Sequence, residues 1–265
     1  MKKLATAFVT LILLLPAGTT RASTPVTFSG SVTTPIKKER GEMLQASAIF
    51  VVSNLNLYVT LSNAGTSNPR SPGDILTGLF FDINGKPKLT PVSATVTGGP
   101  DSSVISHRLP QPFDGDIGAE WAYTNNLADL FPGGTDEGIS STKLKWFKKK
   151  DLFDLSPNSK IPGTSPLSGV QFGITTLDYA VSKDQSGLNN KGFVQNTMVF
   201  VFSGLPENFT VSDISDVNFQ YGSSLKPGFD ITGDMVKQIP EPSALVLIAV
   251  GLVGAAALTR ARARR

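Results

Sequence analysis

Short apolar or alternating runs, each ended by Gly, Pro, Asn or Ser, are the sequence feature that most restricts how this chain can fold. Runs of this length predict β-strands, because strand side chains alternate between two faces and the punctuating residues favour turns. They lie at residues 26–32, 44–52, 55–61, 75–83, 88–97, 103–109, 117–123, 143–147, 170–175, 192–203 and 217–221. One short helical turn is expected at 125–130, and no long stretch between the two ends has sustained helical periodicity. The sequence therefore predicts an all-β fold, a single antiparallel β-sandwich or jelly-roll-like domain.

The dipeptide Asn84-Gly85 lies between two of these runs and predicts a tight β-hairpin, because both residues tolerate the positive φ angles of a type I′ turn. The proline-rich stretch at 154–169 predicts a long surface loop, since strand-like sequence resumes directly after it. A parallel α/β arrangement is disfavoured, because the sequence between the strands offers no crossover helices.

The chain contains no cysteine. A disulfide framework, thiolate catalysis and thiolate metal sites are therefore excluded, and stability must come from a buried core. Residues 23–239 span about 217 positions, which is long enough for one well-packed domain.

The N-terminus has the layout of a secretory signal peptide, with Lys2 and Lys3 followed by an apolar run at 4–15. Small residues follow that run, and cleavage is expected after Ala22, with Gly18 as the second choice. An N-terminal membrane anchor is the alternative interpretation. We therefore predict a helical signal peptide at 1–22.

The C-terminus combines Pro240-Glu241-Pro242, an apolar run at 244–258 and a basic tail with Arg260, Arg262, Arg264 and Arg265. Fifteen helical residues reach about 22 Å, short of the roughly 30 Å hydrocarbon core of a bilayer, so this predicted transmembrane helix is a marginal permanent anchor. The arginines are expected to hold its far end on the cytoplasmic side. The prolines leave an extended, accessible peptide at the membrane surface.

These three parts, in this order, resemble the PEP-CTERM sorting signal of Gram-negative bacteria. The resemblance implies that exosortase, a membrane transpeptidase-like cysteine enzyme, removes the tail at or near the Pro-Glu-Pro tripeptide, as happens to the hydrophobic tail of a GPI signal. It also implies transit through the inner membrane and delivery to the cell surface or extracellular matrix. An ordinary tail anchor is the alternative.

Segments of the exported part also resemble a group of exosortase-dependent surface proteins. They are residues 76–83, 89–94, 120–123, 132–134, 138–141, 195–196, 199–205, 217–222 and 224–225. That group supplies no catalytic residues, so the resemblance implies surface display alone. The expected layout is a signal peptide at 1–22, a β-rich exported domain at 23–225, a stalk at 226–239 and the sorting signal at 240–265.

The net charge of the exported part differs from that of the whole chain. Seven of the 24 Lys and Arg residues lie in the two terminal signals, which leaves 17 basic against 20 acidic residues within 23–239. The alkaline sequence pI of about 9.0 therefore comes from the signals and does not indicate a nucleic-acid partner.

The densest charge run holds Lys143, Lys145, Lys148, Lys149 and Lys150, interleaved with Trp146 and Phe147. Lysines beside aromatic residues are candidates for binding a polyanion, such as an acidic exopolysaccharide. An ordinary edge strand, whose lysines discourage edge-to-edge pairing, is the alternative.

Glu120, in the sequence Glu-Trp-Ala-Tyr, is the candidate general acid for glycoside hydrolysis, with Trp121 and Tyr123 as sugar-stacking aromatics. The alternative is a strand in which both aromatics share one face and Glu120 points away. His107 is the only histidine, which excludes histidine-pair metal sites, and it is expected to be an ordinary surface residue.

Asp114 and Asp116, and with less support Asp82, are candidate calcium ligands, although Asp beside Gly is also typical of a plain turn. Because the turn is the favoured interpretation, no metal or cofactor is predicted. The function expected from the sequence is a non-catalytic exported β-domain that is structural or polysaccharide-associated. A surface hydrolase that uses Glu120 is the alternative.

Overall fold

The protein is described from a computed structural model. Its described residues are 23–33, 43–96, 102–106, 115–125, 127, 135–155, 161, 164–179, 187–189, 191–225 and 230–236. The predicted signal peptide and the predicted sorting signal, together with His107 and Asp114, lie outside these ranges.

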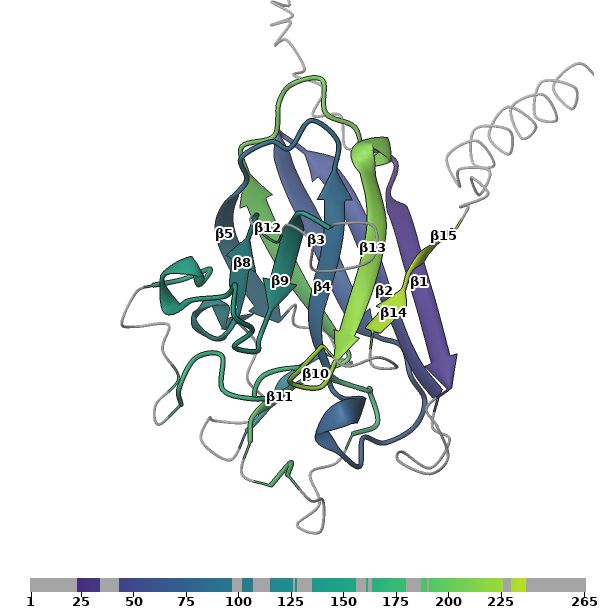
Figure 1. The fold of residues 1–265 in the computed structure, drawn as a ribbon, viewed down its shortest axis with the longest axis vertical. Coiled ribbons are helices and arrows are strands. Elements are labelled where there is room, and N and C mark those ends of the chain that lie inside the picture. Colours follow the sequence, from purple (N-terminus) through teal and green to yellow (C-terminus); the bar gives the residue numbers. More distant parts are fainter. Residues whose placement is uncertain are drawn as a thin grey trace, which may run out of the picture.

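The described strands form two sheets (Figure 1). Sheet A has the order β15 (Asp234–Val236), β1 (Val26–Thr33), β2 (Met43–Ser53), β3 (Asn56–Asn63), β12 (Thr197–Ser203), β5 (Thr90–Val96) and β7 (Gly115–Asp116). Sheet B has the order β14 (Asp230–Thr232), β13 (Ile214–Tyr221), β4 (Leu76–Ile83), β10 (Ile174–Thr175), β11 (Phe193–Gln195) and β6 (Val104–Ile105). In addition, β9 (Glu137–Ser140) pairs with β4, and β8 (Ala122–Thr124) pairs with β9.

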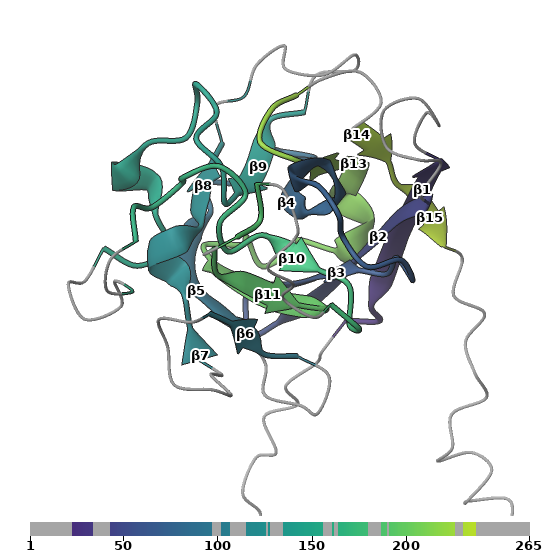
Figure 2. The same cartoon turned by 90° about the horizontal axis from the view of Figure 1, so that it is seen from below.

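The two sheets face each other as a sandwich, with β1, β2 and β3 in one layer and β4, β9 and β13 in the other (Figure 2). The predicted all-β class is confirmed, and of the two predicted architectures the sandwich fits. Pairing is antiparallel except between β10 and β11, which run parallel. Four short 3-10 helices are also described: η1 (Pro72–Asp74), η2 (Gly118–Glu120), η3 (Lys149–Asp151) and η5 (Val211–Asp213).

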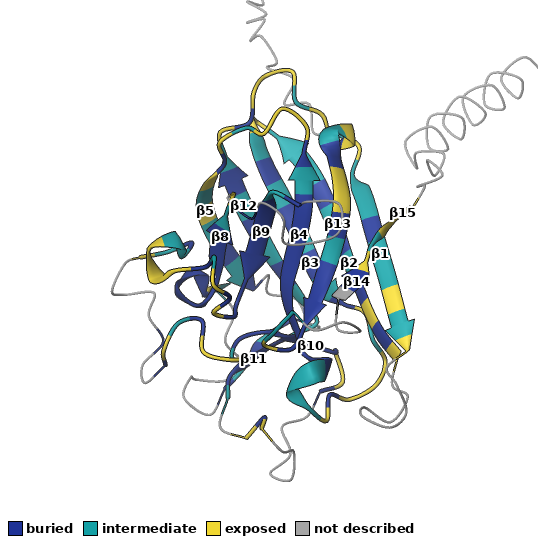
Figure 3. Cartoon of the chain, viewed as in Figure 1, coloured by how far each residue is buried: buried dark blue, intermediate teal, exposed yellow. Residues whose placement is uncertain are grey.

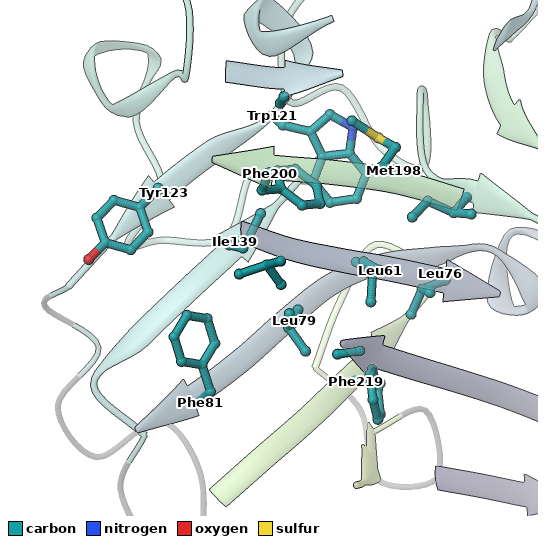
Figure 4. Packing of buried hydrophobic residues seen from close by; sticks show 14 of the residues in the cluster. Leu61, Leu76, Leu79, Phe81, Trp121, Tyr123, Ile139, Met198, Phe200 and Phe219 are labelled. Atoms are coloured by element: carbon teal, nitrogen blue, oxygen red, sulfur yellow. The ribbon is translucent and has the colours of Figure 1, made fainter. Parts of the chain in front are cut away.

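The core lies between the sheets and is rich in aromatic rings. Alternation along β3 and β12 turns every second residue inward, where side chains such as Leu61 and Phe200 are fully buried. Sheet B contributes Leu79 and Phe81 from β4 (Figure 4). The rings of Phe50 and Phe81 join the layers edge to face, with centroids 5.3 Å apart.

The outer face of sheet B is covered by the protein's own chain. Phe80 lies on that face and forms a second buried cluster with Leu144, Phe147 and Leu167 from the segments that follow. The rings of Phe80 and Phe147 lie 6.3 Å apart. Because β4 is packed on both sides, nearly all of its residues are buried (Figure 3).

The prediction of a β-hairpin at Asn84-Gly85 is wrong, because the strands on either side of it, β4 and β5, belong to different sheets. The dipeptide does form a tight turn, closed by the Lys86 amide donating to the Ile83 carbonyl at 3.0 Å, but this turn crosses between layers. The hairpin between β2 and β3 turns instead at Asn54 and Leu55, which both have positive φ angles, 52° and 60°.

Other predicted strands also need correction. The run at 192–203 is two strands in different sheets, separated at Asn196, whose φ is 62°. Residues 143–147 form turns rather than a strand, with the Phe147 amide bonded to the Leu144 carbonyl at 3.1 Å. Residues 117–123 contain η2 before β8 begins, and only the last part of 170–175 is a strand. Most of the helical turn expected at 125–130 lies outside the described residues.

The segment expected to be a stalk contributes two strands to the domain. β14 pairs with β13 in sheet B and β15 pairs with β1 in sheet A, while the amide of Gly233 between them donates to the Val217 carbonyl at 2.7 Å. The two sheets are thus linked along one side by consecutive strands. The folded domain therefore extends past the predicted boundary at 225 and reaches Val236.

Candidate functional site

The segment that carries the predicted lysine cluster is held on sheet B by its apolar residues. Leu144 and Phe147 are buried against Phe80, and Trp146 is partly buried beside them. Anchoring through these side chains turns the intervening polar residues outward. All five predicted lysines, Lys143, Lys145, Lys148, Lys149 and Lys150, are exposed.

Three of these lysines border a surface pocket of about 350 Å³. The pocket is lined by Thr124, Asn125, Lys145, Trp146, Lys148, Lys150 and Asp151. The Lys145 ammonium lies 4.2 Å from the centroid of the Trp146 ring, which is a cation–π distance. Lys143 and Lys149 do not line the pocket. Of the five predicted lysines, three therefore line the pocket, and Lys143 and Lys149 are exposed charges outside it.

The wall of the pocket is built by η3 and the end of β8. The Asp151 carboxylate accepts a hydrogen bond from the Lys148 amide at 2.9 Å, and the Asp151 amide donates to the Lys148 carbonyl at 2.9 Å. A bridge between Ala122 and Leu152 then ties this turn to β8. Because β8 ends beside η3, Thr124 and Asn125 line the same pocket as the lysines.

The pocket carries a net positive charge at neutral pH, since three lysines face one aspartate. The single carboxylate is already engaged by the backbone of η3. None of the three lysines forms a salt bridge with a carboxylate in the part of the chain that the structure describes. Their charges are therefore available to an anion from solution.

Glu120 and its neighbouring aromatics lie in the interior. Glu120 belongs to η2 rather than to a strand, is 1% exposed, and its carboxylate accepts a hydrogen bond from the Thr164 hydroxyl at 2.5 Å. The Trp121 ring packs on Phe200 with centroids 5.0 Å apart. Tyr123 is buried too, so these aromatics form no open platform for a sugar.

A buried carboxyl group that the sequence did not indicate lies on β9. Glu137 is 2% exposed and accepts a hydrogen bond from the Tyr123 hydroxyl. Burial raises the pKa of Glu137 to about 7, and burial together with the neighbouring Glu137 charge raises the pKa of Tyr123. Close by, Lys86 pairs with Asp136 at 2.5 Å.

The other candidates have structural surroundings or are not described. The Asp116 carboxylate accepts a hydrogen bond from the Gly118 amide at 2.6 Å, which is a turn contact. The Asp82 carboxylate accepts one from the Asp136 amide at 2.6 Å, and burial raises the pKa of Asp82. Within the described ranges no three His, Asp or Glu side chains gather closely enough to hold a metal ion.

The C-terminal region is identified by comparison with known families. Residues 238–265 match the family model of the PEP-CTERM protein-sorting motif. No curated protein and no solved structure matches the chain. Among the described residues, no helix has the length and apolar character needed to cross a membrane.

The described residues form a β-domain, and the C-terminal motif implies export and sorting to the cell surface by way of the membrane. The match is confined to this C-terminal region, and it supports processing of the protein by exosortase.

Proposed function

We propose that the β-domain is a non-catalytic module that binds acidic exopolysaccharide at the cell surface or in the extracellular matrix. The observation that carries this proposal is the pocket beside η3, where Lys145, Lys148 and Lys150 converge. Lysine side chains suit a repeating polyanion, because each is a mobile point charge that does not demand one fixed geometry.

The other lining residues complement a sugar ring. Thr124 and Asn125 offer hydroxyl and amide groups for sugar hydroxyls, and Trp146 adds apolar surface. A volume of about 350 Å³ is at the lower end of small-molecule sites, so the pocket accommodates roughly one or two sugar units of a longer chain. We expect weak single contacts that add up along a polymer.

Binding fits this pocket better than hydrolysis. Glycoside hydrolysis usually needs two carboxyl groups flanking the scissile bond. The pocket holds one carboxylate, Asp151, which is occupied by the Lys148 amide. The alternative candidate, Glu120, is buried away from this surface.

The test compares two double variants of the mature protein recovered from the cell surface. Lys145→Gln with Lys148→Gln removes two pocket charges, whereas Lys143→Gln with Lys149→Gln removes two exposed charges that do not line the pocket. With polygalacturonate oligomers as the probe, we expect the pocket variant to raise the dissociation constant about tenfold, or ~1.4 kcal/mol. The flanking variant should change it by less than about twofold, a small effect typical of screened surface charges.

Binding should also weaken as salt rises, since screening shortens the reach of exposed charges. Neutral dextran serves as the control ligand and is expected not to compete. The pocket would be refuted as the binding site if both double variants raised the dissociation constant equally, or if the affinity did not change with salt concentration. Release of shortened oligosaccharides by the wild-type protein would refute the non-catalytic assignment.

A further inference from the structure

The outer face of sheet A, which points away from sheet B, has an unusual composition. Thirteen residues with partly exposed side chains form its central part: Thr27 and Ser29 on β1, Ser47, Ile49 and Val51 on β2, Tyr58, Thr60 and Ser62 on β3, Thr197, Val199 and Val201 on β12, and Ser93 and Thr95 on β5. We call this set the A face. All of its residues are apolar or carry a hydroxyl group, and none is charged.

The strand register places the apolar residues of the A face at its centre. Val51 lies opposite Tyr58, which lies opposite Val201. In the next row Ile49 and Val199 flank Thr60. These side chains form one apolar patch, because directly opposed residues on neighbouring strands contact each other.

Hydroxyl groups surround this patch. Thr27 lies beside Ile49 at one side, and Thr95 lies beside Val199 at the other. Along one end, the hydroxyls of Ser62 and Thr197 are hydrogen-bonded to each other at 2.9 Å. An apolar centre within a polar rim is the anatomy of protein–protein interfaces.

The absence of charge on the A face stands out against the rest of the molecule. Charged residues make up 17% of the chain, and they concentrate on protein surfaces. On the strands that border the A face, the register places Asp234 opposite Ser29 and Asp116 opposite Thr95. Charges are thus found at the margins of the sheet and not on the thirteen central positions.

Sheet B differs, because its outer face is covered by the protein's own chain. Phe80 on that face is fully buried under Leu144 and Phe147. On the A face the side chains stay partly exposed, even at the apolar centre. Exposed apolar patches with a polar rim typically mark contact sites.

We propose that the A face is the contact surface between two copies of this protein. Five strands at about 4.8 Å spacing and three rows of side chains at about 6.8 Å give roughly 500 Å² per copy, or roughly 1,000 Å² in total. This area reaches the lower limit for a specific protein–protein interface. An uncharged face also meets its own copy without like-charge repulsion, as a two-fold interface requires.

A polysaccharide fits the A face less well than a second copy does. An acidic chain would find no cation among the thirteen residues. A neutral chain would find one aromatic ring, Tyr58, where a row of rings is the usual platform for stacking. The proposed contact is independent of the lysine pocket, because that pocket is built on the other sheet.

The experiment measures the mass of the mature protein by sedimentation equilibrium between about 1 and 100 µM, the range in which a small interface dissociates. We expect the apparent mass to rise from one copy to two across this range. Thr60→Lys places a charge at the centre of the A face and should raise the dissociation constant at least about tenfold. Ser215→Lys, at an exposed position on β13, makes a matched change elsewhere and should leave it unaltered.

Val201→Thr keeps the side-chain shape while replacing a methyl group of the apolar patch by a hydroxyl, so it also tests the interface should Thr60→Lys fail to fold. It is expected to raise the dissociation constant about threefold to tenfold. A protein that stays monomeric at every concentration would overturn the proposal, as would Thr60→Lys protein that folds and dimerises like the wild type. Dextran binding that is lost in Thr60→Lys would assign the A face to a neutral glycan instead.

Discussion

Glu137 shows how burial changes the chemistry of a single residue in this fold. Its ordinary pKa is 4.5, and burial raises it to about 7 although the Tyr123 hydroxyl donates to the carboxylate. A raised pKa means that the folded state holds the proton more firmly than the unfolded state does. Folding therefore favours the neutral acid at this position, which suits a buried side chain on β9, the strand that lies between β4 and β8.

The sign of the pH effect follows from that difference. The stabilisation is fully present below about pH 4.5 and is lost as the pH rises to about 7, where the folded carboxyl group also ionises. We expect the free energy of unfolding to fall by on the order of 1 to 3 kcal/mol over this interval.

Denaturant unfolding at several pH values measures this effect. Glu137→Gln should remove most of the pH dependence, because the amide cannot titrate and can still accept the Tyr123 hydrogen bond. Glu207→Gln, at an exposed position, is the control and should keep the wild-type profile. An unchanged slope in Glu137→Gln would mean that another group is responsible.

At the scale of elements, β14 and β15 join the two sheets through a close approach to β1. A Cβ atom on Gly30 would lie 2.5 Å from the Thr232 carbonyl oxygen and 2.7 Å from the Ile231 side chain. Glycine is therefore required where the last two strands pass β1. β15 ends at Val236, and the sorting motif begins at residue 238.

Gly30→Ala should displace β14 and β15, because the obstructing atom is backbone and cannot rotate away. We expect a loss of about 1 to 3 kcal/mol in the free energy of unfolding, typical of overpacking. Ser31→Ala, at the exposed neighbouring position, should cost less than about 0.5 kcal/mol. Chemical denaturation of both variants checks this, and equal stabilities would argue against the close approach.

For the whole molecule, the two proposed surfaces lie on different sheets. The lysine pocket rests on the outer side of sheet B, and the A face is the outer side of sheet A. Two copies joined through the A face would keep both pockets accessible, and such a pair gains avidity for a polymer. This arrangement suits a protein whose C-terminal motif implies sorting to the cell surface.

Processing is tested at the same scale. In a host with exosortase, mass spectrometry of the mature protein should find no residues after Pro242. In a host without the enzyme the apolar run and the terminal arginines should be retained. Replacing Glu241 by Ala within the tripeptide should also leave the tail in place. An intact tail in the host with exosortase would contradict removal at this tripeptide.

Much of the candidate site could be read from the sequence. Lysines interleaved with Trp146 indicated the segment that lines the pocket, because long charged side chains stay in water while neighbouring aromatics are buried. The sequence did not indicate Thr124 and Asn125, since they lie at the end of β8 and directly after it, before the lysine-rich segment in the chain. Residue spacing along the sequence does not show which distant segments pack together.

The sequence by itself determined the all-β class, the exposed lysines and the sorting motif, because each depends on residues close together in the chain. Tertiary structure decided which strands share a sheet: the turn at Asn84-Gly85 crosses between layers, while Asn54 and Leu55 close a true hairpin. It also decided that Glu137 is buried and that the A face is uncharged over five strands. The alternation of apolar and polar residues along a strand indicates which side chains face inward. Strand pairing depends on long-range packing, and so only the folded chain brings together the residues around Glu137 and those of the A face.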